Sequence, residues 1–122
     1  MRPHENLEVW KKAIDLVVSI YDRTKDFPSD EKFGLTSQIR RASVSIPSNV
    51  AEGAARQSDQ EFIRFLSIAQ GSCSEVETQL VISLKLGFLT QPNYSDLKAE
   101  ADSSGRMLVG LSKHLKAKKQ AG

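Results

Sequence analysis

Helical periodicity that passes through a proline is the feature that most constrains how this chain can fold. The segment SIPSNVAEGAAR, residues 45–56, contains Pro47. Apolar residues on both sides of it keep steps of three and four: Leu35, Ile39, Ala42, Ile46 and Val50. Only a continuous helix keeps side chains in register in this way, so we expect one helix over 33–56. It should be kinked at Pro47, because proline lacks an amide donor and its ring clashes with the preceding turn. Two helices, the second capped by Ser48, are the alternative.

Three further segments show helical periodicity, at residues 6–25, 58–86 and 94–116. Short breaks rich in proline or polar residues separate the four segments. No segment shows the alternation typical of a strand. The sequence therefore predicts an all-α fold, an antiparallel up-down four-helix bundle. We expect a single domain over residues 1–122 that ends in a basic C-terminal tail at 117–122.

The third segment carries signals at both of its ends. SDQE, residues 58–61, is typical of a capping box, in which Ser58 accepts a hydrogen bond from the Glu61 amide and the Glu61 side chain reaches back. Gly87 lies where a left-handed C-terminal cap is needed. These signals predict where this helix begins and ends.

The apolar arc of residues 6–25 is wider than one intramolecular face needs. One stripe consists of Leu7, Trp10, Ile14, Val17 and Tyr21, and a second of Val9, Ala13, Leu16 and Ile20. The second helix has a face of mostly small residues that would let another helix approach closely: Ser37, Arg41, Val44, Ser48, Ala51 and Ala55. Ile63, Val81 and Ile82 add apolar surface to the third helix. Large apolar surfaces usually mark interfaces, so we expect a cyclic homo-oligomer.

Positive charge is distributed unevenly along the chain. The net charge of +2 is too small to require a nucleic-acid partner, but cations cluster near the middle and the C-terminal end. A ring of subunits would repeat each cluster and strengthen the local field. We expect phosphate contacts with RNA or DNA from Arg40, Arg41, Arg56, Arg64, Arg106, Lys113, Lys116, Lys118 and Lys119. For Arg40 and Arg41, a solvated face with salt bridges and a contact between subunits are the alternatives.

Residue types that carry chemistry do not form a catalytic or metal-binding motif here. His4 and His114 are the only histidines, and neither has the Glu three residues earlier that a di-metal bundle site uses. Cys73 continues an apolar stripe, which indicates a small core residue, and as the only cysteine it excludes an internal disulfide. We interpret the glutamates at 52, 61, 75 and 77 as solvated or capping. The sequence predicts no enzyme and no cofactor.

Neither a secretory signal peptide nor a membrane-spanning segment is recognisable in the sequence. We therefore expect a cytoplasmic protein without a membrane partner.

Four stretches resemble a known family: LEVWKKAIDLV, FGLTSQIRRASVSIPSNVAEG, SDQEFIRFLSIAQGSCSEVETQL and GRMLVGLSKHL. They look like the signature stretches of the four-helix-bundle family of 23S rRNA intervening-sequence proteins, also labelled ribosomal protein S23-like, and cover about residues 5–116. The family is similar to the accessory variability protein of diversity-generating retroelements, a basic homopentamer that binds nucleic acid and a reverse transcriptase. The resemblance implies a bundle assembled as a five-membered barrel, with no catalytic residues.

Two functions follow as hypotheses. The first is a homo-oligomer that binds RNA or DNA through phosphate contacts. The second is a structural or protein-interaction scaffold without nucleic-acid binding, with another protein as its partner.

Overall fold

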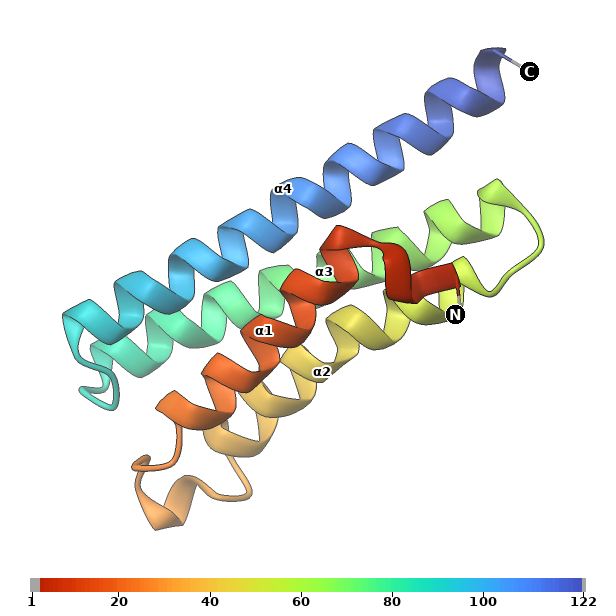
Figure 1. Ribbon diagram of the computed structural model, residues 1–122. Helices are drawn as coiled ribbons and strands as arrows, with labels where there is room; N and C mark the ends of the chain where they lie inside the picture. Colours follow the sequence, from red (N-terminus) through yellow and green to blue (C-terminus); the bar gives the residue numbers. More distant parts are fainter. Residues whose placement is uncertain (1–2, 122) are drawn as a thin grey trace.

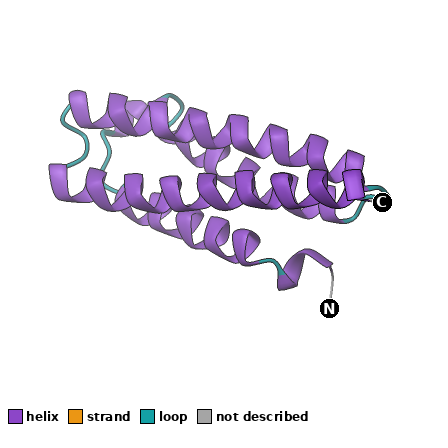
Figure 2. Cartoon of the chain, turned by 90° about the horizontal axis from the view of Figure 1, so that it is seen from above, coloured by secondary structure: helices purple, strands orange, loops and turns teal. Residues whose placement is uncertain are grey.

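A computed structural model describes residues 3–121 of the 122-residue chain, and it shows an all-α bundle, as predicted (Figure 1). Two short 3-10 helices, η1 (Pro3–Asn6) and η2 (Ser29–Glu31), precede α1 and α2. The four long helices are α1 (Glu8–Arg23), α2 (Leu35–Ala54), α3 (Asp59–Lys85) and α4 (Gln91–Ala121). Each helix packs against the next along the chain, and α1 also packs against α4, which closes the bundle. Figure 2 shows the long helices lying lengthwise beside one another, joined by short loops. No strand occurs within residues 3–121.

The core lies between the inner faces of the four helices. On α1 the stripe of Val9, Ala13, Leu16 and Ile20 is the buried one. The other helices complete the core with Leu35, Ile39, Ala42, Ile46 and Val50 of α2, Leu66, Ala69, Cys73, Val76 and Leu80 of α3, and Leu97, Ala101, Leu108 and Leu115 of α4. The other α1 stripe lies at the edge of the core, where Ile14 and Tyr21 are exposed and Trp10 and Val17 are half-buried.

Helix α2 runs without interruption through Pro47, so the expectation of a single helix is confirmed. Pro47 is buried, and polar side chains bond to carbonyl groups within about two turns of it. The Ser43 hydroxyl donates to Arg40 O at 2.8 Å, and Asn49 Nδ2 donates to Ser45 O at 2.8 Å. Neither bond involves the carbonyl of Ser43, which is the group that loses its helical donor because residue 47 is a proline. A bend at Pro47 stays a prediction.

The predicted caps of α3 are present. Ser58 Oγ accepts from the Glu61 amide at 3.1 Å, although the Glu61 carboxylate bonds to Arg64 Nε at 2.9 Å instead of reaching back. At the other end Gly87 has φ +80°, and the amides of Gly87 and Phe88 donate to earlier carbonyls at 3.0 and 2.9 Å. This pair of bonds is a Schellman cap, which is why glycine is needed there.

The bounds of α4 correct the predicted range 94–116 at both ends. Thr90 Oγ1 accepts from the Asn93 amide at 3.2 Å and starts the helix at Gln91, and Pro92 is tolerated in this first turn. At the other end the helix continues to Ala121 through most of the predicted tail. The other three helices begin and end within two residues of the predicted ranges.

Candidate functional site

At one end of the bundle residues 55–58 connect α2 to α3, and α4 finishes at the same end (Figure 1). The segments at this end carry several cationic residues. Lys118 Nζ on α4 lies 3.6 Å from Asp59 Oδ2 in the first turn of α3. The Arg56 and Arg64 guanidinium groups lie 4.9 and 4.6 Å from the centroid of the same aromatic ring, that of Phe65. We call this surface the basic end; it consists of Arg56, Arg64, Lys113, Lys116 and Lys118.

Acidic neighbours compensate part of the charge of the basic end. Arg56 pairs with Glu52 at 3.2 Å, and Arg64 pairs with Glu61 at 2.9 Å. The hydrogen bond from Arg64 and its charge lower the pKa of the Glu61 carboxyl. Lys113 and Lys116 are exposed and form no ion pair with any side chain that the structure describes. These two lysines are therefore the uncompensated charges of the surface.

Arg40 and Arg41 lie at the opposite end of the bundle from the basic end. They precede Arg56 by about 16 residues, which corresponds to about 24 Å along a helix axis. The structure thus does not bring the predicted phosphate-binding residues together on one subunit as a single surface.

Arg40 joins α1 to α2. Its Nε donates to the buried Thr24 Oγ1 at 2.9 Å, its Nη2 donates to Tyr21 O at 3.3 Å, and its guanidinium lies 4.5 Å from the centroid of the Tyr21 ring. All of these partners are uncharged, so the bonding differs from the expected salt bridges with acids. Arg41, by contrast, is exposed on the side of α2 that faces α3.

The remaining two predicted residues lie on α4. Arg106 is exposed and lines a hollow between α3 and α4. Lys119 belongs to α4, but its side chain lies outside the part of the chain whose side chains the structure describes.

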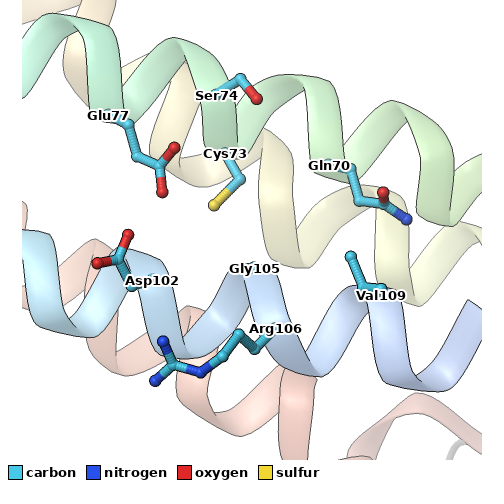
Figure 3. A pocket seen from close by; sticks show the side chains of 8 residues that line it. All are labelled: Gln70, Cys73, Ser74, Glu77, Asp102, Gly105, Arg106 and Val109. Atoms are coloured by element: carbon cyan, nitrogen blue, oxygen red, sulfur yellow. The ribbon is translucent and has the colours of Figure 1, made fainter.

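The α3–α4 hollow has a volume of about 430 Å³ (Figure 3). The Cys73 thiol lies at its floor, is 4% exposed and donates to Ala101 O at 3.4 Å. Burial, together with the negative charges of Glu77 and Asp102, raises the pKa of Cys73 to about 11. A thiol with such a pKa stays protonated near neutral pH, which agrees with the interpretation of Cys73 as a core residue.

Glu77 of α3 and Asp102 of α4 point toward one another across this hollow (Figure 3). Burial has the largest effect on the pKa of Glu77 and raises it. A hydrogen bond with Asp102 and the negative charge of Asp102 raise it further. Hydrogen bonds from Lys98 and then from Glu77 lower the pKa of Asp102. The pKa values of the two carboxyl groups are therefore shifted in opposite directions, as in other close carboxyl pairs, so Glu77 binds a proton more readily than Asp102 does.

An apolar groove runs between the outer faces of α1 and α2, and we call it the α1–α2 groove. One section, of about 560 Å³, is lined mainly by Val17, Val18, Tyr21 and Val44. A second section, of about 290 Å³, shares Val17 and Val44 with it and adds Trp10, Ile14, Ser48 and Ala51. The groove joins the exposed stripe of α1 to part of the small-residue face of α2. The groove is thus part of the apolar surface that the sequence predicted for self-association.

Sequence reasoning missed two residues. Glu77 was grouped with the solvated glutamates, although it faces a carboxylate on another helix. Phe33 was given no role, yet it is 90% exposed. A large aromatic side chain between Lys32 and Gly34, just before the apolar phase of α2 begins, was a signal that could have found it.

Two features are absent from the described residues. No helix among them is both long and apolar enough to cross a membrane. No group of three or more His, Cys, Asp or Glu side chains among them is placed to hold a metal ion.

Comparison with known proteins gives a consistent result. The model of the 23S rRNA-intervening sequence protein family matches residues 5–110. The fold is similar to the crystal structure of a protein of unknown function from the S23 ribosomal protein family of Bacteroides thetaiotaomicron, with a TM-score of 0.80 and 25% sequence identity over 86% of this chain and 98% of that one. No curated protein matches the sequence.

Proposed function

Since the chain belongs to the 23S rRNA-intervening sequence protein family, we propose that it is a non-enzymatic homo-oligomer that binds RNA or DNA through phosphate contacts. The observation that supports binding is the basic end, where the last turns of α4, the α2–α3 connection and the first turns of α3 carry five cations. We propose five subunits because the sequence resembles a family that is similar to the retroelement accessory protein. We propose the cytoplasm as its compartment, because RNA and DNA are accessible there.

The basic end is suited to phosphates rather than to bases. Lys113 and Lys116 are exposed and uncompensated, and lysine binds phosphate as a point charge without reading sequence. The ion pairs of Arg56 and Arg64 are at the surface, where such pairs contribute little free energy, so both guanidinium groups can exchange their carboxylates for phosphates. Both arginines lie close to the ring of Phe65, which is itself buried and cannot stack on a base.

Binding should therefore tolerate changes of sequence and weaken steeply with salt. Fluorescence anisotropy with labelled duplex DNA and RNA, from about 50 to 200 mM salt, measures this dependence. On duplex DNA the log–log slope is close to −0.9 for each phosphate neutralised, so replacing Lys113 and Lys116 with Ala should reduce its magnitude by about 1.8 for each contacting subunit.

The matched control replaces Lys32 and Lys85 with Ala, which removes the same charge from the opposite end of the bundle. This control should keep the slope of the wild type. If the wild type binds neither nucleic acid at about 50 mM salt, the proposal of phosphate binding is wrong.

The second candidate function is a structural or protein-interaction scaffold that does not bind nucleic acid. The α1–α2 groove favours it, because the exposed Val18, Tyr21 and Val44 form a continuous apolar surface. Light scattering of the wild type at micromolar concentration tests the self-association that both functions share. A monomer mass would contradict it, whereas a stable dimer would contradict only the number of subunits.

A further inference from the structure

Phe33 is the most exposed large apolar side chain that the structure describes, at 90%. Its one aromatic contact is with Lys32, whose Nζ lies 5.5 Å from the ring centroid. Such a side chain offers the apolar area of an aromatic ring, which is among the largest contributions that one residue makes to an interface.

The turn that carries Phe33 is held firmly. Glu31 Oε2 accepts from the Leu35 amide at 2.9 Å and caps the first turn of α2, while the Gly34 amide donates to Glu31 O at 3.0 Å. A Cβ atom at position 34 would lie 2.8 Å from Glu31 Oε2, so a side chain there would displace the capping carboxylate. A ring presented by an ordered turn loses little conformational freedom when it binds.

The α1–α2 groove offers a complementary surface. Its larger section, of about 560 Å³, lies within the range of cavities that bury small organic ligands, so it has room for one aromatic ring. Val17, Val18 and Val44 supply apolar contacts, and Tyr21 supplies an aromatic one.

The charges around the two surfaces are also complementary. Lys25 and Arg40 border the groove; Lys25 pairs with Asp22, the one acidic residue of the lining, at 3.0 Å, and Arg40 leaves the rim with a net positive charge. The turn carries Asp30 and Glu31 beside a single cation, Lys32. A positive rim thus meets a negative turn, as in interfaces that are steered electrostatically.

Phe33 and the groove belong to different sides of α2. Phe33 borders the hollow between α2 and α3, whereas the groove lies between α2 and α1. We propose that Phe33 of one copy of the chain inserts into the α1–α2 groove of the next copy. Because this contact pairs two different surfaces, it can repeat from one subunit to the next. The chain of subunits closes into a ring when the rotation that relates neighbouring subunits divides a full turn evenly. The inference rests on the proposed homo-oligomer and names its contact.

A complementation experiment tests the contact. Phe33→Asp removes the inserted ring and keeps the groove, whereas Val18→Asp places a charge in the groove and keeps the ring. Both residues are exposed, at 90% and 63%, so circular dichroism should show native helicity for both variants. By light scattering at micromolar concentration, each variant alone should be a monomer, and an equimolar mixture should form a 1:1 dimer.

Val109→Asp, an exposed apolar position on α4, is the matched control and should keep the wild-type mass. If Phe33→Asp keeps the wild-type mass, or if the mixture stays monomeric, the contact is wrong while self-association stands. A monomeric wild type would overturn both proposals. Should Phe33→Asp fail to fold, Phe33→Ala should still weaken association about 30-fold, as truncation of a central aromatic does, and no weakening would overturn the contact.

Discussion

The carboxyl group of Glu77 on α3 faces that of Asp102 on α4, and of the two only Asp102 pairs with Lys98, at 2.9 Å. This asymmetry shifts the pKa values of the two carboxyl groups in opposite directions. The lysine favours ionised Asp102, whereas burial and the neighbouring carboxylate disfavour ionised Glu77.

Glu77→Gln should raise the free energy of unfolding at pH 7. The pKa of Glu77 is raised in the folded state. The Glu77 side chain therefore makes its full contribution to the free energy of unfolding below pH 4.5, the ordinary pKa of the group. This contribution is lost as the pH rises through the raised pKa of the folded state. Glutamine resembles the protonated acid at every pH. The advantage of the variant should therefore disappear as pH falls toward 4, which urea unfolding between pH 3.5 and 8 measures. The exposed Glu75→Gln is the control, and an advantage that persists at low pH would contradict the prediction.

Gly53→Ala should destabilise the fold by about 1–3 kcal/mol, because overpacking has this cost. An added Cβ would lie 2.8 Å from Phe65 Cβ and 2.9 Å from Phe62 Cδ1, where α2 approaches α3. Gly71→Ala is the matched control: no atom lies within 4 Å of its added Cβ, so helix propensity should stabilise it by up to about 1 kcal/mol. Thermal unfolding of the two variants should shift in opposite directions.

Ser58→Ala should cost about 1 kcal/mol, since it removes the side-chain acceptor of the Glu61 amide at the start of α3. Ser67→Ala, at an exposed position within the same helix, should change stability by less than about 0.5 kcal/mol. Urea unfolding measures both. Equal effects of the two substitutions would show that the cap contributes nothing of its own.

Arg40→Ala should cost about 1–2 kcal/mol, because it removes two hydrogen bonds and a cation–π contact that join α1 to α2. Arg41→Ala should be nearly neutral, since Arg41 is exposed and makes no hydrogen bond with a side chain or backbone group that the structure describes. Urea denaturation distinguishes the two. A larger loss of unfolding free energy in Arg41→Ala than in Arg40→Ala would contradict the prediction.

Periodicity predicted the fold because each helix has to bury a continuous inner face. The regular spacing of apolar residues from Leu35 to Val50 was enough to predict that α2 passes through Pro47. The capping signals at Ser58 and Gly87 located both ends of α3. The start of α4 was missed because Thr90 and Pro92 form a capped first turn that has no apolar periodicity.

The candidate site was less predictable, because charge along the sequence does not show where side chains meet. Arg40 and Arg56 both counted as basic residues of the middle of the chain, yet α2 places them near opposite ends of the bundle. Burial of an acid depends on the neighbouring helix, so Glu77 could not be distinguished from the exposed Glu75 by residue type alone.

The pairing of α1 with α4 has a consequence for synthesis of the chain. Ser19 bonds to Glu100 at 3.1 Å and Arg23 to Asn93 at 2.6 Å, so the first long helix is completed by the last one. The 31 residues of α4 take about 2–6 s to synthesise at about 5–20 residues per second. During that interval the inner faces of α1 and α3 lack the part of their cover that α4 provides, so the nascent chain exposes apolar surface to chaperones and to aggregation.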